Sequence, residues 1–169
     1  DMLNTLDRYY DKQNVYDIKI ISTMGLVDED IESLQKIKKI KEIEGSYSKD
    51  VLINDSESEY VINISSLPNN INKIEPIEGH LPLNENEIVV EENFINKTNY
   101  KIGDTITIDD DDFTNKELTI VGTILSPLYF NNTDVNQTRG TSTLGTGSVN
   151  YYSYIPKSNF NQEYYTSIY

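Results

Sequence analysis

Two alternating runs of apolar and polar residues around a charged turn constrain the fold of this chain most strongly. Thr105–Ile108 and Leu118–Val121 both alternate with a period of two, which is typical of half-buried strands. Four consecutive aspartates, Asp109–Asp112, lie in the segment between the two runs. A polar tip between two such runs indicates a β-hairpin. The sequence therefore predicts an antiparallel strand pair at this point.

A short strand and a short helix precede the predicted hairpin. A turn containing Gly79 and Pro82 leads into the apolar run Glu87–Val90, which reads as a strand. A helix is expected from about Glu91 to Lys97, and Ile102–Asp104 then turns the chain into the hairpin. These elements make residues 69–125 a predicted strand–helix–hairpin unit.

Residues 15–68 are predicted to form a first strand–helix–strand unit. Val15–Thr23 is rich in β-branched residues and is expected to be a mostly buried strand. A helix is expected to begin near Asp28, and two strands follow, at residues 43–54 and 59–67. The two units predict a mixed α+β fold in which the helix of the first unit covers one face of a sheet.

Charges at both ends support the helix that begins near Asp28. Acidic side chains in its first turn and lysines at its end both interact favourably with the helix dipole. The lysines are Lys36, Lys38, Lys39 and Lys41. The apolar positions at helical spacing, which predict a buried stripe, are Val27, Ile31, Leu34 and Ile37.

The remaining regions are a helix, a loop and returning strands. Apolar residues at positions 2, 3, 6, 9 and 10 share one helical face, so residues 1–14 are expected to be a helix. Residues 126–150 are rich in Thr, Asn and Gly and are expected to be a mobile loop. Residues 151–169 are expected to return as strands, the first of which, Tyr151–Ile155, stops at Pro156.

Composition limits the classes of function. The length of 169 residues fits one domain, and the lack of cysteine excludes disulfides and thiolate metal sites. The formal net charge of −14 argues against binding of nucleic acid or anionic lipid. It favours either a cationic partner or, more simply, a well-solvated surface. No run approaches the roughly 18 apolar residues of a membrane span, and no signal peptide is present.

Acidic clusters offer two candidate sites, and each has a simpler interpretation. Asp109–Asp112 could hold calcium, but the run lacks the spaced ligands of an EF-hand loop, and adjacent acids at a tip are usually solvated. Glu91 and Glu92 could act as a carboxylate pair, but their place in the first turn of a helix is explained by the helix dipole. Asp109–Asp112 is therefore not expected to bind a metal, and Glu91 and Glu92 are not expected to act as an acid–base pair.

No other pattern indicates catalysis. The single histidine, His80, lies in the predicted Gly79–Pro82 turn without a partner motif. The glycines at 140, 145 and 147 lack the Walker spacing of a phosphate-binding loop, and no nucleophile elbow or metal-protease motif occurs. The chain is therefore expected not to be an enzyme and to carry no cofactor.

Several short motifs occur in an order that resembles a known family. They are Glu78-Gly79 with Pro82, the EIVV strand at residues 87–90, IGDTI at residues 102–106, VGT at residues 121–123, residues 16–30, and Tyr151–Pro156. Together they resemble the MacB-like periplasmic core domain of FtsX-like ABC transporter permeases, of the Gram-positive type. The resemblance covers most of residues 8–160.

The resemblance implies a non-catalytic domain on the extracytoplasmic face of the cell membrane. It implies a separate cytoplasmic ATPase subunit, whose ATP hydrolysis would drive movement of this domain for export of peptide or lipoprotein-type cargo or for regulation of a partner. Residues 1–14 would then be a stalk helix that continues from a membrane helix upstream of Asp1, and the chain would also continue beyond Tyr169. Residues 15–169 would form the core.

Two other functions stay open at the level of sequence. The chain could be a secreted or surface-anchored binding module without a transport role. A hydrolase that uses the acidic residues is a weaker alternative, because the sequence offers no nucleophile and base.

In the permease interpretation, the predicted loop would contact a partner or a peptide cargo. The residues expected to make this contact are Tyr129, Phe130 and Arg139.

Overall fold

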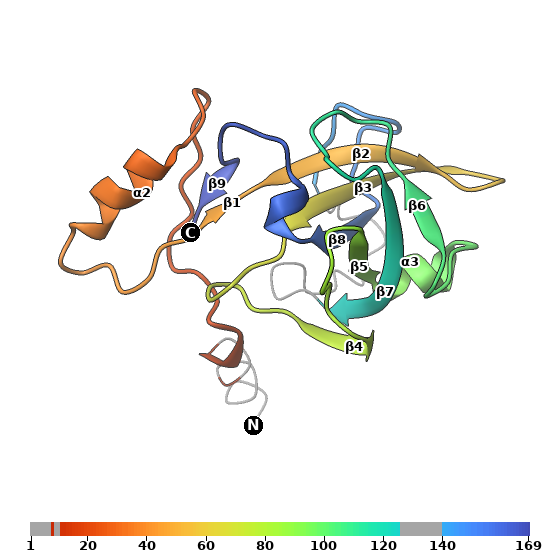
Figure 1. The fold of residues 1–169 in the computed structure, drawn as a ribbon, viewed down its shortest axis with the longest axis horizontal. Coiled ribbons are helices and arrows are strands. Elements are labelled where there is room, and N and C mark those ends of the chain that lie inside the picture. Colours follow the sequence, from red (N-terminus) through yellow and green to blue (C-terminus); the bar gives the residue numbers. More distant parts are fainter. Residues whose placement is uncertain (1–7, 9–10, 126–139) are drawn as a thin grey trace.

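A computed structural model describes residue 8, residues 11–125 and residues 140–169 of the chain (Figure 1). The described part is a mixed α+β fold, mostly sheet with few helices, as the sequence predicts. A large twisted sheet fills one side of the molecule, and a small two-stranded ribbon with one helix beside it fills the other.

Nine strands are present in the described part of the chain. They are β1 (Gly45–Ser46), β2 (Ser48–Asn54), β3 (Glu59–Ser66), β4 (Glu75–Gly79), β5 (Glu87–Glu91), β6 (Thr105–Thr107), β7 (Glu117–Leu125), β8 (Tyr151–Ile155) and β9 (Ser167–Ile168). The helices in the same residues are α2 (Asp28–Gln35), α3 (Glu92–Lys97) and a single 3-10 turn, η1 (Lys157–Asn159). Arg8 and residues 11–13 are also helical.

The large sheet has seven strands in the order β2-β3-β8-β5-β7-β4, with β6 also paired to β7. The pairs β3–β8 and β5–β7 are parallel, and the other pairs are antiparallel. The late strand β8 therefore lies between two early ones, and all five of its residues are buried. The predicted strand at Tyr151–Ile155 is confirmed, and its central place joins the two halves of the sheet.

The predicted hairpin is confirmed as β6–β7, with Ile106 opposite Leu118. On the same edge of β7, the strand β4 pairs further along, with Gly79 opposite Gly122. The sequence analysis expected only a turn around Gly79 and missed β4. All five residues of β4 are exposed, so the strand carries no alternating apolar pattern that would mark it in the sequence.

Apolar side chains pack on both faces of the sheet. One face carries a continuous core that includes Ile62, Ile88 and Phe94, each of which is fully buried. The opposite face carries smaller clusters around Val89 and Val61, because neighbouring residues of a strand point to opposite faces. Short buried runs such as β5 are therefore apolar at consecutive positions.

The first predicted unit is only partly correct. Val15–Thr23 is not a regular strand: Ile20 alone forms a bridge, and the side chains of Ile18 and Ile21 are 69% and 67% exposed. The helix begins at Asp28, as predicted, where the Val27 N–H donates to the Asp30 carboxylate at 2.9 Å.

The helix α2 ends at Gln35, so the lysines at 36–41 lie beyond its last turn rather than within it. No residue of α2 is buried, and the helix lies beside the β1–β9 ribbon instead of covering the large sheet (Figure 1). The predicted buried stripe and the helix-covered sheet face of the first unit are therefore wrong. The core of the sheet is covered instead by aromatic residues that include Phe94 of α3, Phe113 and Phe160.

The predicted loop at residues 126–150 is described from residue 140 onward. Thr141 and Ser148 form a bridge, and Val149 is buried with Val61 and Tyr152 on one face of the sheet. Half-buried Leu144 packs against the same cluster. Residues 140–150 thus form a turn packed on the sheet, while the mobility of the segment as a whole stays a prediction.

The close approach of β4 to β7 requires glycine at position 122. A Cβ atom there would lie 2.6 Å from the Glu78 carbonyl oxygen and 2.7 Å from that of His80. We expect Gly122→Ala to lower the free energy of unfolding by about 2 kcal/mol or more, because two backbone segments must separate. Thr105→Ala, at an exposed strand position, should cost less than about 1 kcal/mol. Urea unfolding of both variants tests this, and equal losses would contradict it.

Candidate functional site

The segments at the two ends of the described chain lie side by side. We call residues 14–26 the N-terminal segment and residues 163–169 the C-terminal segment, and their contact the terminal junction. Ile20 and Ile168 exchange two backbone hydrogen bonds, of 2.8 and 3.0 Å, and the Tyr165 N–H donates to the Leu26 carbonyl at 2.8 Å. The C-terminal segment therefore holds the N-terminal segment in place.

The C-terminal segment also pairs with β1 on its other side. Gly45 lies opposite Ile168 in the β1–β9 ribbon, and Tyr169 exchanges two hydrogen bonds of 2.9 Å with Glu44. Ile168 is 1% exposed. The terminal junction is thus a narrow three-stranded arrangement with β9 in the middle, and it is continuous with the large sheet through the short step from β1 to β2.

An aromatic cluster ties the terminal junction to the sheet. The Tyr47 ring lies 4.9 Å from that of Tyr165 and 5.3 Å from that of Phe160, and the Lys157 ammonium lies 4.5 Å from the centre of the Tyr165 ring. The Tyr165 hydroxyl donates to the Asp28 carboxylate at 2.7 Å. Burial, and then Asp28, raise the pKa of the Tyr165 hydroxyl well above its ordinary value. It therefore stays a neutral donor at physiological pH.

Gly25 allows the C-terminal segment to approach the turn before α2. Its φ angle is +88°, and a Cβ atom there would lie 2.7 Å from the Tyr164 ring. Both the backbone conformation and the contact favour glycine. The sequence analysis expected Gly25 to end a strand, but the structure shows that the residue makes room for a tyrosine from the other end of the chain.

An apolar groove of about 430 Å³ opens at the terminal junction. One wall comes from the N-terminal segment, the other from the end of α2 and the residues that follow it, and Ile168 and Tyr169 also line the groove. Its apolar residues include Val15, Ile18, Leu34, Ile37, Ile40 and Ile43. The volume lies within the range of ligand-binding pockets, so the groove is a candidate binding site.

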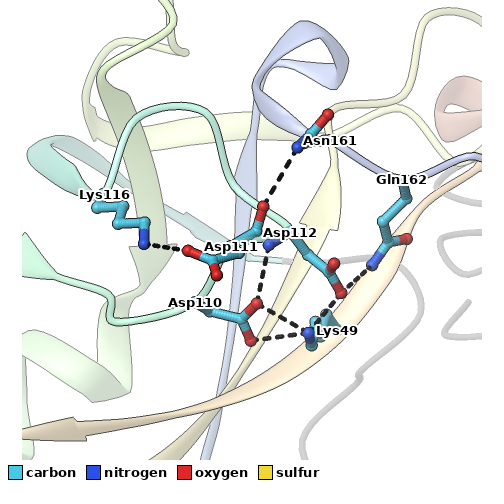
Figure 2. A network of polar contacts seen from close by, with 7 residues as sticks. All are labelled: Lys49, Asp110, Asp111, Asp112, Lys116, Asn161 and Gln162. Atoms are coloured by element: carbon cyan, nitrogen blue, oxygen red, sulfur yellow. Dashed lines mark hydrogen bonds and ion pairs between the residues drawn. The ribbon is translucent and has the colours of Figure 1, made fainter.

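The acidic tip at Asp109–Asp112 does not simply project into solvent (Figure 2). Lys49 of β2 bonds to Asp110 at 2.8 Å and also to Asp112. Asp111 forms an ion pair with Lys116 at 2.5 Å, and among the aspartates in ion pairs in the described structure it alone has a fully exposed side chain. The prediction of a solvated tip is therefore wrong for Asp110, whose side chain is 23% exposed, because a lysine from a distant strand lies against it. The side chain of Asp112 is 42% exposed and contacts the same lysine.

The Lys49 contacts fasten the predicted hairpin to another part of the sheet. Burial opposes ionisation of Asp110, but hydrogen bonds from Lys49 and from the Asp112 N–H outweigh it and hold the pKa of Asp110 below its ordinary value. Gln162 also donates to Asp112, at 3.3 Å, and Asn161 to the Asp111 carbonyl oxygen at the same distance (Figure 2). The chain that leads into the C-terminal segment is thus anchored to the same tip.

The other sequence candidates show structural roles where the structure describes them. Glu91 is 6% exposed and accepts the Tyr152 N–H at 3.2 Å, whereas Glu92 is exposed. His80 is exposed, as expected, with a ring nitrogen 2.8 Å from the Leu81 carbonyl oxygen. The carboxylate pair does not meet at a shared site.

The predicted partner contacts lie outside the described residues, so their place in the fold stays a prediction. These residues are Tyr129, Phe130 and Arg139. Within the residues that are described, no group of three or more His, Cys, Asp or Glu side chains could hold a metal ion. In the same part of the chain, no helix is long and apolar enough to cross a membrane.

The groove is not predicted from the sequence, although one feature of the sequence indicates it. Ile37 and Ile40 alternate with the four lysines in the segment 36–41, which we call the basic loop. Ile37 is part of the predicted buried helical stripe, and Ile40 lies one helical turn after it. Because α2 ends at Gln35, Ile37 and Ile40 lie in an irregular segment, where they line the groove.

Comparisons with known proteins agree with this fold. No protein-family model and no curated protein matches the sequence. The extracellular domain of the noncanonic ABC-type transporter YknZ from Gram-positive bacteria has a similar structure, with a TM-score of 0.55 and 12% identity over 87% of this chain and 73% of that one.

The periplasmic region of MacB from Actinobacillus actinomycetemcomitans has a TM-score of 0.48 and 12% identity, over 85% of this chain and 63% of that region. The fold conclusion rests on the YknZ domain. The chain therefore shares the fold of the YknZ extracellular domain, which confirms the predicted mixed α+β fold.

The contacts of Lys49 predict a pH-dependent contribution to stability. We expect Asp110→Asn to lower the free energy of unfolding by about 1 kcal/mol at pH 7, since the pair is only partly buried. A lowered folded-state pKa stabilises the fold above the ordinary carboxyl value of 3.8, and this contribution is lost as pH falls through the folded value. The difference between variant and parent should therefore shrink below pH 3.8.

Urea unfolding at pH 7 and pH 3 measures this difference. Asp109→Asn is the matched control, because Asp109 is exposed and lies next to Asp110 without an ion pair in the described structure. A loss for Asp109→Asn equal to that for Asp110→Asn would show that the charge of the tip, rather than the Lys49 contact, matters.

Proposed function

We propose that this chain is the extracytoplasmic domain of an ABC transporter permease. It would be non-catalytic and would move in response to ATP hydrolysis by a separate cytoplasmic ATPase subunit, either to export peptide or lipoprotein-type cargo or to regulate a partner. The observation that carries the proposal is the fold shared with the extracellular domain of YknZ, combined with the terminal junction.

The terminal junction fits a domain that is tethered at both ends. The rings of Tyr16 and Tyr169 lie 4.9 Å apart, so the last residue of the C-terminal segment lies beside the N-terminal segment. Hydrogen bonds at Ile20 and Glu44 hold the last strand between the two neighbouring segments. A displacement of either tether would then move the ribbon and, through β1 and β2, the large sheet.

A surface binding module without a transport role is the alternative. The apolar groove favours it, because a groove of this size can hold a ligand without any transporter. In either case we propose that Tyr129, Phe130 and Arg139 contact the partner or cargo, and this rests on the sequence alone. Two measurements bear on these functions: the side of the membrane on which the domain lies, and whether the domain responds to ATP.

The location is testable with one introduced cysteine, since this chain has none. In cells that express the full-length protein with its other cysteines replaced, we expect Ser56→Cys to react with a membrane-impermeant maleimide. Ser56 is exposed at the turn between β2 and β3. Ile62→Cys is the matched control, since Ile62 is 0% exposed and should not react. Labelling of Ser56→Cys only after permeabilisation would contradict an extracytoplasmic place.

Coupling is testable by loosening one tether. In the reconstituted permease with its ATPase, a fluorophore on Ser56→Cys should respond to ATP. Inserting two glycines between Tyr16 and Asp17 should abolish this response, because flexible residues do not transmit displacement. The same insertion between Glu57 and Ser58, at the exposed β2–β3 turn, should leave the response in place.

A response that survives the insertion after Tyr16 would mean that the tether does not carry the movement. Absence of any nucleotide response in the parent protein would favour the binding module. Both variants should keep the parent rate of ATP hydrolysis, which shows that the complex has assembled.

A further inference from the structure

The groove at the terminal junction lies between two pieces of chain that lack a strand partner. One is Asp17–Lys19 and the other is Lys41–Ile43. In the part of the chain that the structure describes, the backbone N–H and C=O groups of Ile18 and Glu42 form no hydrogen bond. The β-branched side chain of Ile18 is 69% exposed. Both features are expected of a strand whose neighbour is absent.

The line of β9 leads directly between these two pieces. Ile168 exchanges its backbone hydrogen bonds with Ile20 on one side, and Tyr169 exchanges its own with Glu44 on the other. A central strand in an antiparallel sheet bonds alternately to its two neighbours in this way. The bonding therefore alternates from Ile168 to Tyr169.

Continuing this register identifies the next partners. The first residue after Tyr169 would exchange hydrogen bonds with Ile18, and the second with Glu42, one residue pair further along on each side. These are the two residues whose backbone groups are without partners. The ladder would end there, since the chain bends at Asp17 and the Tyr16 N–H already donates to the Asn72 side chain at 3.0 Å.

The charges around the groove identify the side chains that it favours. The four lysines of the basic loop are all exposed, and none forms an ion pair among the described residues of this strongly acidic chain. Lys39 and Lys41 line the groove, next to Ile37 and Ile40, and Asp17 and Glu42 line it as well. A strand with apolar residues matches the apolar walls, and an acidic residue placed beside Lys39 and Lys41 would pair with these lysines.

We propose that the groove is the slot for one further extended strand of the same polypeptide, which enters in line with β9 and pairs with Ile18 and Glu42. This inference rests on the proposed function, in which the polypeptide continues beyond Tyr169. Pairing would complete the N-terminal segment as a strand and would bury the exposed side chain of Ile18. The two tethers would then be joined by a longer ladder than β9 alone provides.

The test is to append the sequence Val-Glu-Val-Glu after Tyr169 and to measure amide hydrogen exchange by NMR. We expect exchange at Ile18 and Glu42 to slow by about tenfold or more relative to the chain without the addition. Asp17 and Ile43 should exchange at unchanged rates, because alternate amides of a strand point away from the added neighbour.

The matched control is the addition of Pro-Glu-Val-Glu, since proline cannot donate the hydrogen bond that Ile18 would accept. The proline carbonyl can still accept from the Ile18 N–H, so the pair would rest on one hydrogen bond instead of two, and this variant should show less protection at Ile18 than the Val-Glu-Val-Glu addition. Unchanged exchange at the buried residue Val89 shows that both proteins keep their fold.

Equal exchange at Ile18 and Glu42 with and without the Val-Glu-Val-Glu addition would overturn the slot. A second measurement adds Val-Glu-Val-Glu as a separate peptide to the chain that ends at Tyr169. If the separate peptide slowed exchange at Ile18 and Glu42 and the appended sequence did not, the slot would also be overturned, in favour of a separate partner. The result is independent of the maleimide experiment: a slot can fill in a protein that is not a permease, and a labelled Ser56→Cys can occur with an empty slot.

Discussion

The large sheet depends on one strand that comes late in the chain and pairs in its middle. Ser153 of β8 donates to the Asn63 carbonyl at 2.9 Å, across 90 residues, and Tyr152 bonds to Glu91 across 61. Without β8, the strands β3 and β5 would each expose an unpaired edge to water. Pairing over such distances is slow to form, and it makes the two halves of the sheet one cooperative body.

This dependence explains which parts of the fold could be predicted. The β6–β7 hairpin and the β5–α3 connection are local. The alternation of apolar and polar residues, the turn residues and the helix length were therefore enough to predict them. The strand character of Tyr151–Ile155 was equally visible. Its neighbours were not, because a fully buried strand has the same composition wherever it pairs. The exposed edge strand β4 has no apolar alternation and was missed for that reason.

The candidate site was less predictable, because its parts meet only in the folded chain. Lys49 lies 61 residues before Asp110 in the sequence, and nothing local pairs the two side chains. The segment Val15–Thr23 has the composition of a strand, yet its local sequence does not show whether a neighbour is present. The structure gives it one bridge, at Ile20, and leaves Ile18 open.

The terminal junction combines stiff and open parts, and the difference bears on the proposed movement. On one side, the ring of Tyr47 is packed against those of Tyr165 and Phe160. Phe160 comes just after η1, which follows β8, so the junction is joined to the centre of the sheet. On the other side, α2 has no buried residue and packs loosely against a groove. A displacement that enters through β9 therefore meets a rigid path toward β8 and a compliant one toward α2. Because packed aromatic contacts resist deformation more than an open groove does, the sheet would move as a unit while the region around α2 adapts.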